Sequence, residues 1–166
     1  MIIGIGGVSR AGKTTLAFRI RNWIGQEKVK ILHQDEYIKS LDQMPKINGH
    51  IDWEHPESLD FIRLKEDMEQ ACKDFEVLIV EGLMVFWNRK LTDLLQKKIY
   101  LTIDKEAFLE RKTIDKRWED EPEWYIEHIW ESHFKYGKLP PHSKDVLQLD
   151  GESGLGKKII MNFLNI

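Results

Sequence analysis

A glycine-rich turn between an apolar segment and a helix stands at the start of this chain. Met1–Gly6 is rich in isoleucine, as expected of a buried strand, and residues 7–14 (GVSRAGKT) match the pattern G-x-x-x-x-G-K-[ST] at every fixed position. Glycines let the backbone curve so that N–H groups converge on a phosphate, and the positive end of a helix predicted over Thr14–Gly25 faces the same anion. Lys13 would bind the outer phosphates, and the Thr14 hydroxyl would ligate a bridging Mg²⁺. The stretch therefore predicts binding of a nucleoside triphosphate.

Two other interpretations of this stretch compete with phosphate binding. A glycine-rich strand-to-helix turn can be purely structural, but the strand before the motif and the helix after it are the context that phosphate binding requires. The dinucleotide fingerprint G-x-G-x-x-G fails, because Gly4 and Gly6 are followed by Ser9 where the third glycine should stand. Phosphate binding remains the favoured interpretation.

Length and composition narrow the class of protein. A chain of 166 residues, with 42% hydrophobic and 32% charged residues, is expected to form one globular domain (1–166) with a proper core. The net charge of −3 and the absence of a basic stripe give no reason to expect a nucleic-acid partner. No apolar run approaches the ~20 residues of a membrane span, so no membrane association is expected. The single cysteine, Cys72, excludes an internal disulfide, is expected to be packed, and fits a cytoplasmic location.

Apolar runs alternate with amphipathic segments along the chain. Strands are predicted at Met1–Gly6, Val29–His33, Val77–Glu81, Lys98–Ile103 and Val146–Leu149. Helices are predicted at Thr14–Gly25, Glu57–Lys73, Trp87–Leu95, Lys105–Lys116, Pro122–Lys138 and Leu155–Leu164. This alternation is typical of an α/β fold with a parallel sheet and helices on both faces, in which ligands bind at the carboxyl ends of the strands.

Acidic residues follow two of these predicted strands. Asp35 stands two positions after the second strand, and Glu81 ends the buried run of the third. A carboxylate at the end of an apolar strand is costly unless it binds a cation or hydrogen-bond donors. Both residues are therefore candidates to face the phosphate loop and a metal, although Asp35 or Glu36 could instead cap a short helix at Tyr37.

Two further segments carry candidate ligand contacts. The basic run at residues 111–117, followed by Glu119-Asp120-Glu121-Pro122, is expected to end a helix and open a closing loop, or else to be a solvated helix end. In the predicted loop at residues 47–60, Trp53 and Glu54 could stack on a flat ring and bind sugar hydroxyls, or Trp53 could simply cover the core edge.

Taken together, the segments GVSRAGKTT, QDEYIK, IDWEHPESLD and LIVEGLMVF, with the basic RK…R run, resemble the uridine kinase-like branch of P-loop kinases. Within that branch the likeness is greatest to nicotinamide riboside kinases, and it extends from residue 1 to about 151. The resemblance implies a three-layer P-loop NTPase fold with a five-stranded parallel sheet in the order 2-3-1-4-5 and a lid at about residues 111–124. It also implies an ATP- and Mg²⁺-dependent kinase that phosphorylates the 5′-hydroxyl of a ribonucleoside, acting as a monomer or homodimer.

The resemblance also implies roles for individual positions. Asp35 would be the catalytic base, with Lys13 as the second catalytic residue. ATP would be bound by Gly7, Val8, Ser9, Arg10, Ala11, Gly12, Lys13, Thr14, Thr15 and Arg111. The small-molecule substrate would be bound by Asp35, Glu36, Tyr37, Trp53, Glu54, Glu81, Lys112 and Arg117, and the metal by Thr14, Asp35 and Glu81.

This sequence departs from the family pattern in places that concern the acceptor. Trp53 and Glu54 stand where nicotinamide riboside kinases carry a Tyr-Asp pair, and the lid is less basic than usual. The short stretch between Asp35 and Trp53 disfavours a true uridine or cytidine kinase with its larger hairpin. Two alternatives stay open: a GTPase-like nucleotide switch, although neither N-K-x-D nor D-x-x-G is present, and a kinase for another small alcohol such as pantothenate or a sugar.

Overall fold

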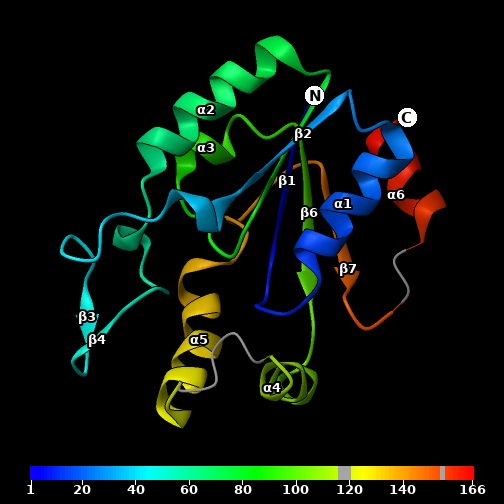
Figure 1. The fold of residues 1–166 in the computed structure, drawn as a ribbon. Coiled ribbons are helices and arrows are strands. Elements are labelled where there is room, and N and C mark those ends of the chain that lie inside the picture. Colours follow the sequence, from blue (N-terminus) through cyan, green and yellow to red (C-terminus); the bar gives the residue numbers. More distant parts are fainter. Residues whose placement is uncertain (116–120, 154–155) are drawn as a thin grey trace.

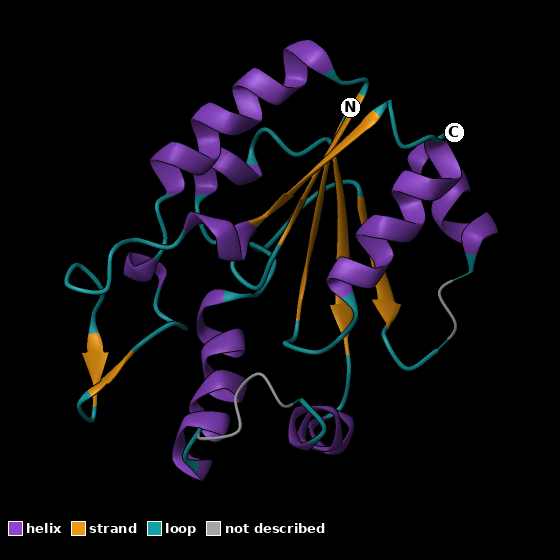
Figure 2. Ribbon diagram, viewed as in Figure 1, coloured by secondary structure: helices purple, strands orange, loops and turns teal. Residues whose placement is uncertain are grey.

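The computed structural model describes residues 1–115, 121–153 and 156–166 and has a five-stranded parallel sheet at its centre (Figures 1 and 2). The strands of this sheet are β1 (Ile2–Gly7), β2 (Val29–His33), β5 (Val77–Glu81), β6 (Lys97–Thr102) and β7 (Val146–Asp150). Their order across the sheet is β2-β5-β1-β6-β7, and all neighbouring pairs are parallel. All five carboxyl ends therefore lie at one edge, where the phosphate loop, α4 and α5 also lie (Figure 1).

Helices cover both faces of the sheet, which gives the three layers predicted from the sequence. The α-helices are α1 (Lys13–Ile24), α2 (Phe61–Asp74), α3 (Arg89–Thr92), α4 (Lys105–Thr113), α5 (Glu123–Tyr136) and α6 (Lys157–Leu164). The side chains of β5 alternate between two cores: Ile79 packs with α1 and α6 on one face, and Leu78 packs with α2 and α3 on the other. No helix in the described ranges is both long and apolar enough to span a bilayer.

The strand numbering differs from the predicted order because the sequence analysis missed a small hairpin. Two-residue strands, β3 (Lys46–Ile47) and β4 (His50–Ile51), pair with one another outside the main sheet. Counting only the five strands of the main sheet, the order is 2-3-1-4-5. The hairpin turns at Asn48-Gly49, both with positive φ, a pair typical of tight hairpins.

Three local predictions are corrected. The helix predicted to begin at Glu57 begins at Phe61, because the Asp60 side chain accepts hydrogen bonds from the backbone N–H groups of the first turn. Pro56 instead opens a separate 3-10 turn, η2 (Pro56–Ser58). The helix predicted over Trp87–Leu95 is only the single turn α3. Cys72, expected to be packed, is exposed.

Gly7 is the position in β1 where a side chain is least acceptable. Its φ is 137°, and a Cβ there would lie 2.0 Å from the carbonyl oxygen of Leu101 in β6. We expect Gly7→Ala to lower the free energy of unfolding by about 2–4 kcal/mol, measured by urea denaturation, because backbone atoms must move. Gly156→Ala is the control: a Cβ there makes ordinary contacts, and its effect should stay within about 0.5 kcal/mol. Equal effects of the two substitutions would contradict this account.

Candidate active site

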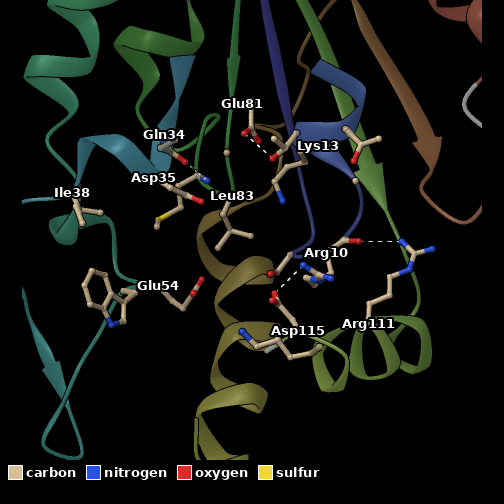
Figure 3. A pocket seen from close by; sticks show the side chains of 18 of the residues that line it. Arg10, Lys13, Gln34, Asp35, Ile38, Glu54, Glu81, Leu83, Arg111 and Asp115 are labelled. Carbon is tan, nitrogen blue, oxygen red and sulfur yellow. Dashed lines mark hydrogen bonds and ion pairs between the residues drawn. The ribbon is translucent and has the colours of Figure 1, made fainter. Parts of the chain in front are cut away.

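A pocket of about 820 Å³ lies at the carboxyl edge of the sheet (Figure 3). It brings together side chains from the phosphate loop, the ends of β2 and β5, the loop that follows β4, and the end of α4. The lining residues are Ser9, Arg10, Gly12, Lys13, Thr14, Thr15, Gln34, Asp35, Ile38, Trp53, Glu54, Leu59, Glu81, Gly82, Leu83, Met84, Arg111, Lys112, Asp115 and Glu121. Most of the predicted site residues are therefore neighbours in space, although they come from segments far apart in the sequence.

The phosphate loop connects β1 to α1 and has backbone conformations that only a few residue types adopt readily. Gly7, Arg10 and Gly12 have positive φ angles of 137°, 66° and 95°. Such alternations turn successive N–H groups toward a common concavity, as anion-binding nests require. Val8 and Ala11 are buried in the core, so their predicted contribution to nucleotide binding is through the backbone.

Lys13 opens α1 and is surrounded by carboxylates. Its Nζ donates a hydrogen bond to the carbonyl oxygen of Val8, 2.9 Å away. Burial lowers the pKa of Lys13, while nearby Glu81, Asp35 and Glu54 favour its charged form. The hydrogen bond to the Val8 carbonyl thus holds the lysine against its own loop.

Glu81 ends β5 and is 6% exposed. Its Oε1 accepts a hydrogen bond from the Thr14 hydroxyl at 2.9 Å and lies 2.7 Å from Nδ1 of His33. The structure thus places the predicted pair Thr14 and Glu81 in direct contact. His33 is not among the predicted site residues, although it is the last residue of β2 and lies beside Glu81 in the sheet register.

Asp35 and Gln34 begin the 3-10 helix η1 (Gln34–Tyr37) at the end of β2. Asp35 is exposed and lines the pocket opposite the phosphate loop (Figure 3). The buried Gln34 accepts a hydrogen bond from the Met84 N–H at 2.8 Å, which ties the end of β2 to the loop after β5. This contact across 50 residues fixes the backbone from which Asp35 projects.

Glu36 and Tyr37, predicted to bind substrate, do not belong to the described lining of the pocket. The Tyr37 side chain is buried, and its hydroxyl donates to Asp67 of α2 at 2.8 Å. Glu36 is exposed, and its carbonyl oxygen accepts a hydrogen bond from Arg63. Both residues fasten η1 to α2.

Trp53 and Glu54 follow the hairpin and are held in place by α5. The Trp53 N–H donates to the Tyr125 hydroxyl at 2.9 Å, and the Glu54 N–H donates to Asp52 Oδ1 at 3.1 Å. Asp52 is buried and lies 2.8 Å from Nε2 of His128. The two residues predicted to bind the acceptor substrate are therefore positioned by Asp52, Tyr125 and His128. None of these three was predicted as a site residue.

The basic residues at the end of α4 face the same pocket. Arg111 donates from Nη1 to the Arg10 carbonyl at 3.1 Å and from Nη2 to the Gly151 carbonyl at 3.3 Å. Lys112 forms an ion pair with Glu121 at 2.8 Å. Arg117 lies outside the described residues, as do the other residues of the predicted lid from 116 to 120.

Burial changes the protonation of Glu54. It raises the pKa of this carboxyl to about 8, opposed by Lys112 and reinforced by Asp35, Asp52 and Glu121. Near neutral pH a large fraction of Glu54 therefore keeps its proton and can donate as well as accept a hydrogen bond.

This shift predicts a pH dependence of stability. Between the ordinary value of 4.5 and about 8, the folded protein binds a proton at Glu54 that the unfolded chain has lost, so the free energy of unfolding falls as pH rises. We expect Glu54→Gln to remove this dependence, so that the variant gains stability relative to the parent from pH 5 to pH 9. Urea unfolding without nucleotide or metal measures it, and a constant difference across that range would contradict the prediction.

Comparison with known proteins gives both sequence and structural relatives. No family model matches the chain. Nicotinamide riboside kinase 2 of Mus musculus is 27% identical over 172 aligned residues, covering 91% of this chain and 87% of the relative. A uridine kinase of Chlamydia pneumoniae is 31% identical over 140 residues, covering 69% of this chain and 63% of the relative. This chain therefore spans somewhat less than two thirds of that uridine kinase.

Solved structures agree on the fold. A possible uridine kinase from Bacillus stearothermophilus superposes with a TM-score of 0.51 at 19% identity, covering 84% of this chain and 86% of that one. A sugar kinase from Janibacter sp. HTCC2649 gives 0.61 at 13% identity, covering 99% and 94%. At such identities these matches support the fold alone.

The fold is the one that these solved kinases share. The kinase class predicted from the sequence is confirmed by the sequence relatives. Within that class, the resemblance to the uridine kinase-like branch, which includes nicotinamide riboside kinases, is confirmed. The alternative of a GTPase-like switch is not favoured, since these sequence relatives are named kinases.

Proposed function

We propose that this chain is an ATP-dependent kinase that transfers the γ-phosphoryl group to the 5′-hydroxyl of a ribonucleoside resembling nicotinamide riboside or uridine. The observation that carries the proposal is the position of Asp35, which lines the same pocket as Lys13 and the phosphate loop. A carboxylate opposite a phosphate-binding loop is the arrangement that phosphoryl transfer to an alcohol requires. The sequence relatives, which are named as kinases of these two nucleosides, support the same acceptor class.

The chemistry assigned to these residues is an in-line displacement. The 5′-hydroxyl oxygen forms a bond to the γ-phosphorus while the bond from that phosphorus to the β–γ bridging oxygen breaks. ADP leaves with the bonding electron pair, and Asp35 accepts the hydroxyl proton. Lys13 neutralises charge on the outer phosphates, so positioning and electrostatics supply most of the acceleration.

The donor set at this edge fits Mg²⁺ as part of the proposal. The Thr14 hydroxyl and the Glu81 carboxylate are in contact, and Asp35 lines the same pocket, so oxygen donors of the kind this ion prefers gather beside the phosphate loop. Thr14, Asp35 and Glu81 would hold the ion together with phosphate oxygens. When bound, it would neutralise phosphate charge.

The other half of the pocket is assigned to the acceptor. Its lining includes the apolar residues Ile38, Leu59 and Leu83. It also includes Trp53, whose indole can stack on a planar base. Glu54 would bind ribose hydroxyls. Arg111 and Lys112 are assigned to phosphate and substrate contacts at the base of a lid near residues 111–124. A cytoplasmic location and a monomer or homodimer remain predictions.

A substrate panel tests the proposal. The protein is incubated with ATP, Mg²⁺ and single acceptors, including nicotinamide riboside, uridine, pantothenate and simple sugars, and each product is weighed by mass spectrometry. We expect the gain of one phosphoryl group on a ribonucleoside. Transfer only to pantothenate or a sugar, or nucleotide hydrolysis that ignores the acceptor and prefers GTP, would contradict it.

A further inference from the structure

Arg10 occupies a position that the phosphate-loop pattern leaves open, yet its conformation is unusual for its residue type. Its φ of 66° lies in the left-handed region, where a glycine would be less strained. A strained non-glycine residue in a ligand loop points to a role for its side chain. Here that side chain lines the pocket next to Lys13.

The Arg10 side chain is held from one side. Its Nη1 forms an ion pair with Oδ2 of Asp115 at 2.8 Å, and the Asp115 side chain is only 6% exposed (Figure 3). The Arg10 carbonyl accepts a hydrogen bond from Arg111 on α4. Both the backbone and the guanidinium of Arg10 are therefore fixed by the end of α4, more than 100 residues away in sequence.

The Nε of Arg10 is buried and has no hydrogen-bond partner among the described residues. A buried unsatisfied donor is costly, and a guanidinium bears five N–H groups of which Asp115 can engage at most a few. The donors of Arg10 thus complement an oxyanion of the kind that the neighbouring amides and Lys13 are built to hold.

We infer that Arg10 is a second cationic contact to the γ-phosphoryl group, supplied by the phosphate loop itself, and that Asp115 is a positioning residue that aims it. The inference rests on the proposed phosphoryl transfer, and deepens it. As the γ-phosphorus passes from the β–γ bridging oxygen to the acceptor oxygen, Arg10 stabilises the charge on the non-bridging oxygens. The proton still goes to Asp35, and ADP still leaves with the electron pair.

The inference is tested with Arg10→Ala, Arg10→Gly and Arg10→Lys. Loss of the guanidinium should lower kcat about 100-fold and weaken ATP binding about tenfold, while ADP binding, which lacks the γ-phosphoryl group, changes less than threefold. Arg10→Gly removes the side chain without backbone strain, so it should lose as much activity as Arg10→Ala. Arg10→Lys should recover part of kcat, because it restores one charge without the planar fork.

A mutant cycle tests the positioning role of Asp115. Asp115→Asn should lower kcat about tenfold in the parent and have no further effect in Arg10→Ala, since it acts through Arg10. Lys105→Ala, at the start of α4, is the control: it breaks a partly exposed ion pair with Glu127 and should leave kcat unchanged.

Several outcomes would overturn the inference. They are a kcat of Arg10→Ala within threefold of the parent, additive losses from the Arg10 and Asp115 substitutions, or equal losses of ATP and ADP affinity. If kcat falls only in proportion to a lower melting temperature and Arg10→Lys does not restore it, Arg10 has a structural role instead. If the parent phosphorylates no nucleoside, the proposed function fails, while the ratio of ATP to ADP affinity still tests Arg10.

Discussion

Asp35→Asn should lower kcat by about 10²–10⁴-fold while leaving the affinity for ATP within about threefold of the parent value. The amide keeps the shape of the side chain but cannot take up the proton of the substrate hydroxyl. Because Asp35 is exposed, the substitution should change the free energy of unfolding by less than about 0.5 kcal/mol. Steady-state kinetics with the best acceptor of the panel, together with calorimetric titration of ATP, measures both quantities.

Glu36→Gln is the matched control for this experiment. Glu36 is the next residue, is also exposed, and does not belong to the described pocket lining, so kcat should stay near the parent value. Full activity of Asp35→Asn would remove the proposed base. Equal losses in the two variants would mean that η1, rather than one carboxylate, is required.

Lys13→Met should abolish most phosphoryl transfer, with kcat falling about 10³-fold and ATP binding much weakened. The same substitution should maintain or raise the stability of the nucleotide-free protein, because burial already lowers the pKa of Lys13 and so disfavours its charge. A substitution that lowers activity but raises stability indicates a residue that serves function at a cost in stability. Kinetics and urea unfolding without nucleotide measure the two sides.

Lys65→Met is the control for Lys13→Met. Lys65 lies on α2 and pairs with Glu69 at the surface. Lys65→Met should therefore leave kcat unchanged and alter the free energy of unfolding by less than about 0.5 kcal/mol. A large loss of stability in Lys13→Met would contradict the expected trade-off. Unchanged transfer would contradict the role given to the phosphate loop.

Much of this arrangement could be predicted from local sequence. The strand Val77–Glu81 was predicted with its observed bounds, because a β-branched run that ends in a carboxylate has few alternatives. The rule that ligands gather at the carboxyl ends of parallel strands then predicts that Asp35 and Glu81 lie at one edge of the sheet. The phosphate loop followed from residue types whose backbone freedom and charge the site requires.

The rest depends on contacts between distant segments. Nothing near Tyr37 in the sequence shows that its hydroxyl donates to Asp67, so the contact that fastens η1 to α2 could not be predicted. The hairpin was missed because its strands have only two residues each, too few for alternation to be visible. The pairing of Arg10 with Asp115 likewise joins two segments that no periodicity relates.

The loop that presents Trp53 and Glu54 is fastened to α5 by Tyr125 and His128. Neither anchor belongs to the described pocket lining, so a substitution at either one would shift the loop without altering the side chains that line the pocket. Libraries that vary these two anchors could retune acceptor preference while the phosphate-handling half of the enzyme stays constant. The acceptor preference of related kinases could diverge in the same manner, through substitutions on the helix equivalent to α5 that do not contact the acceptor.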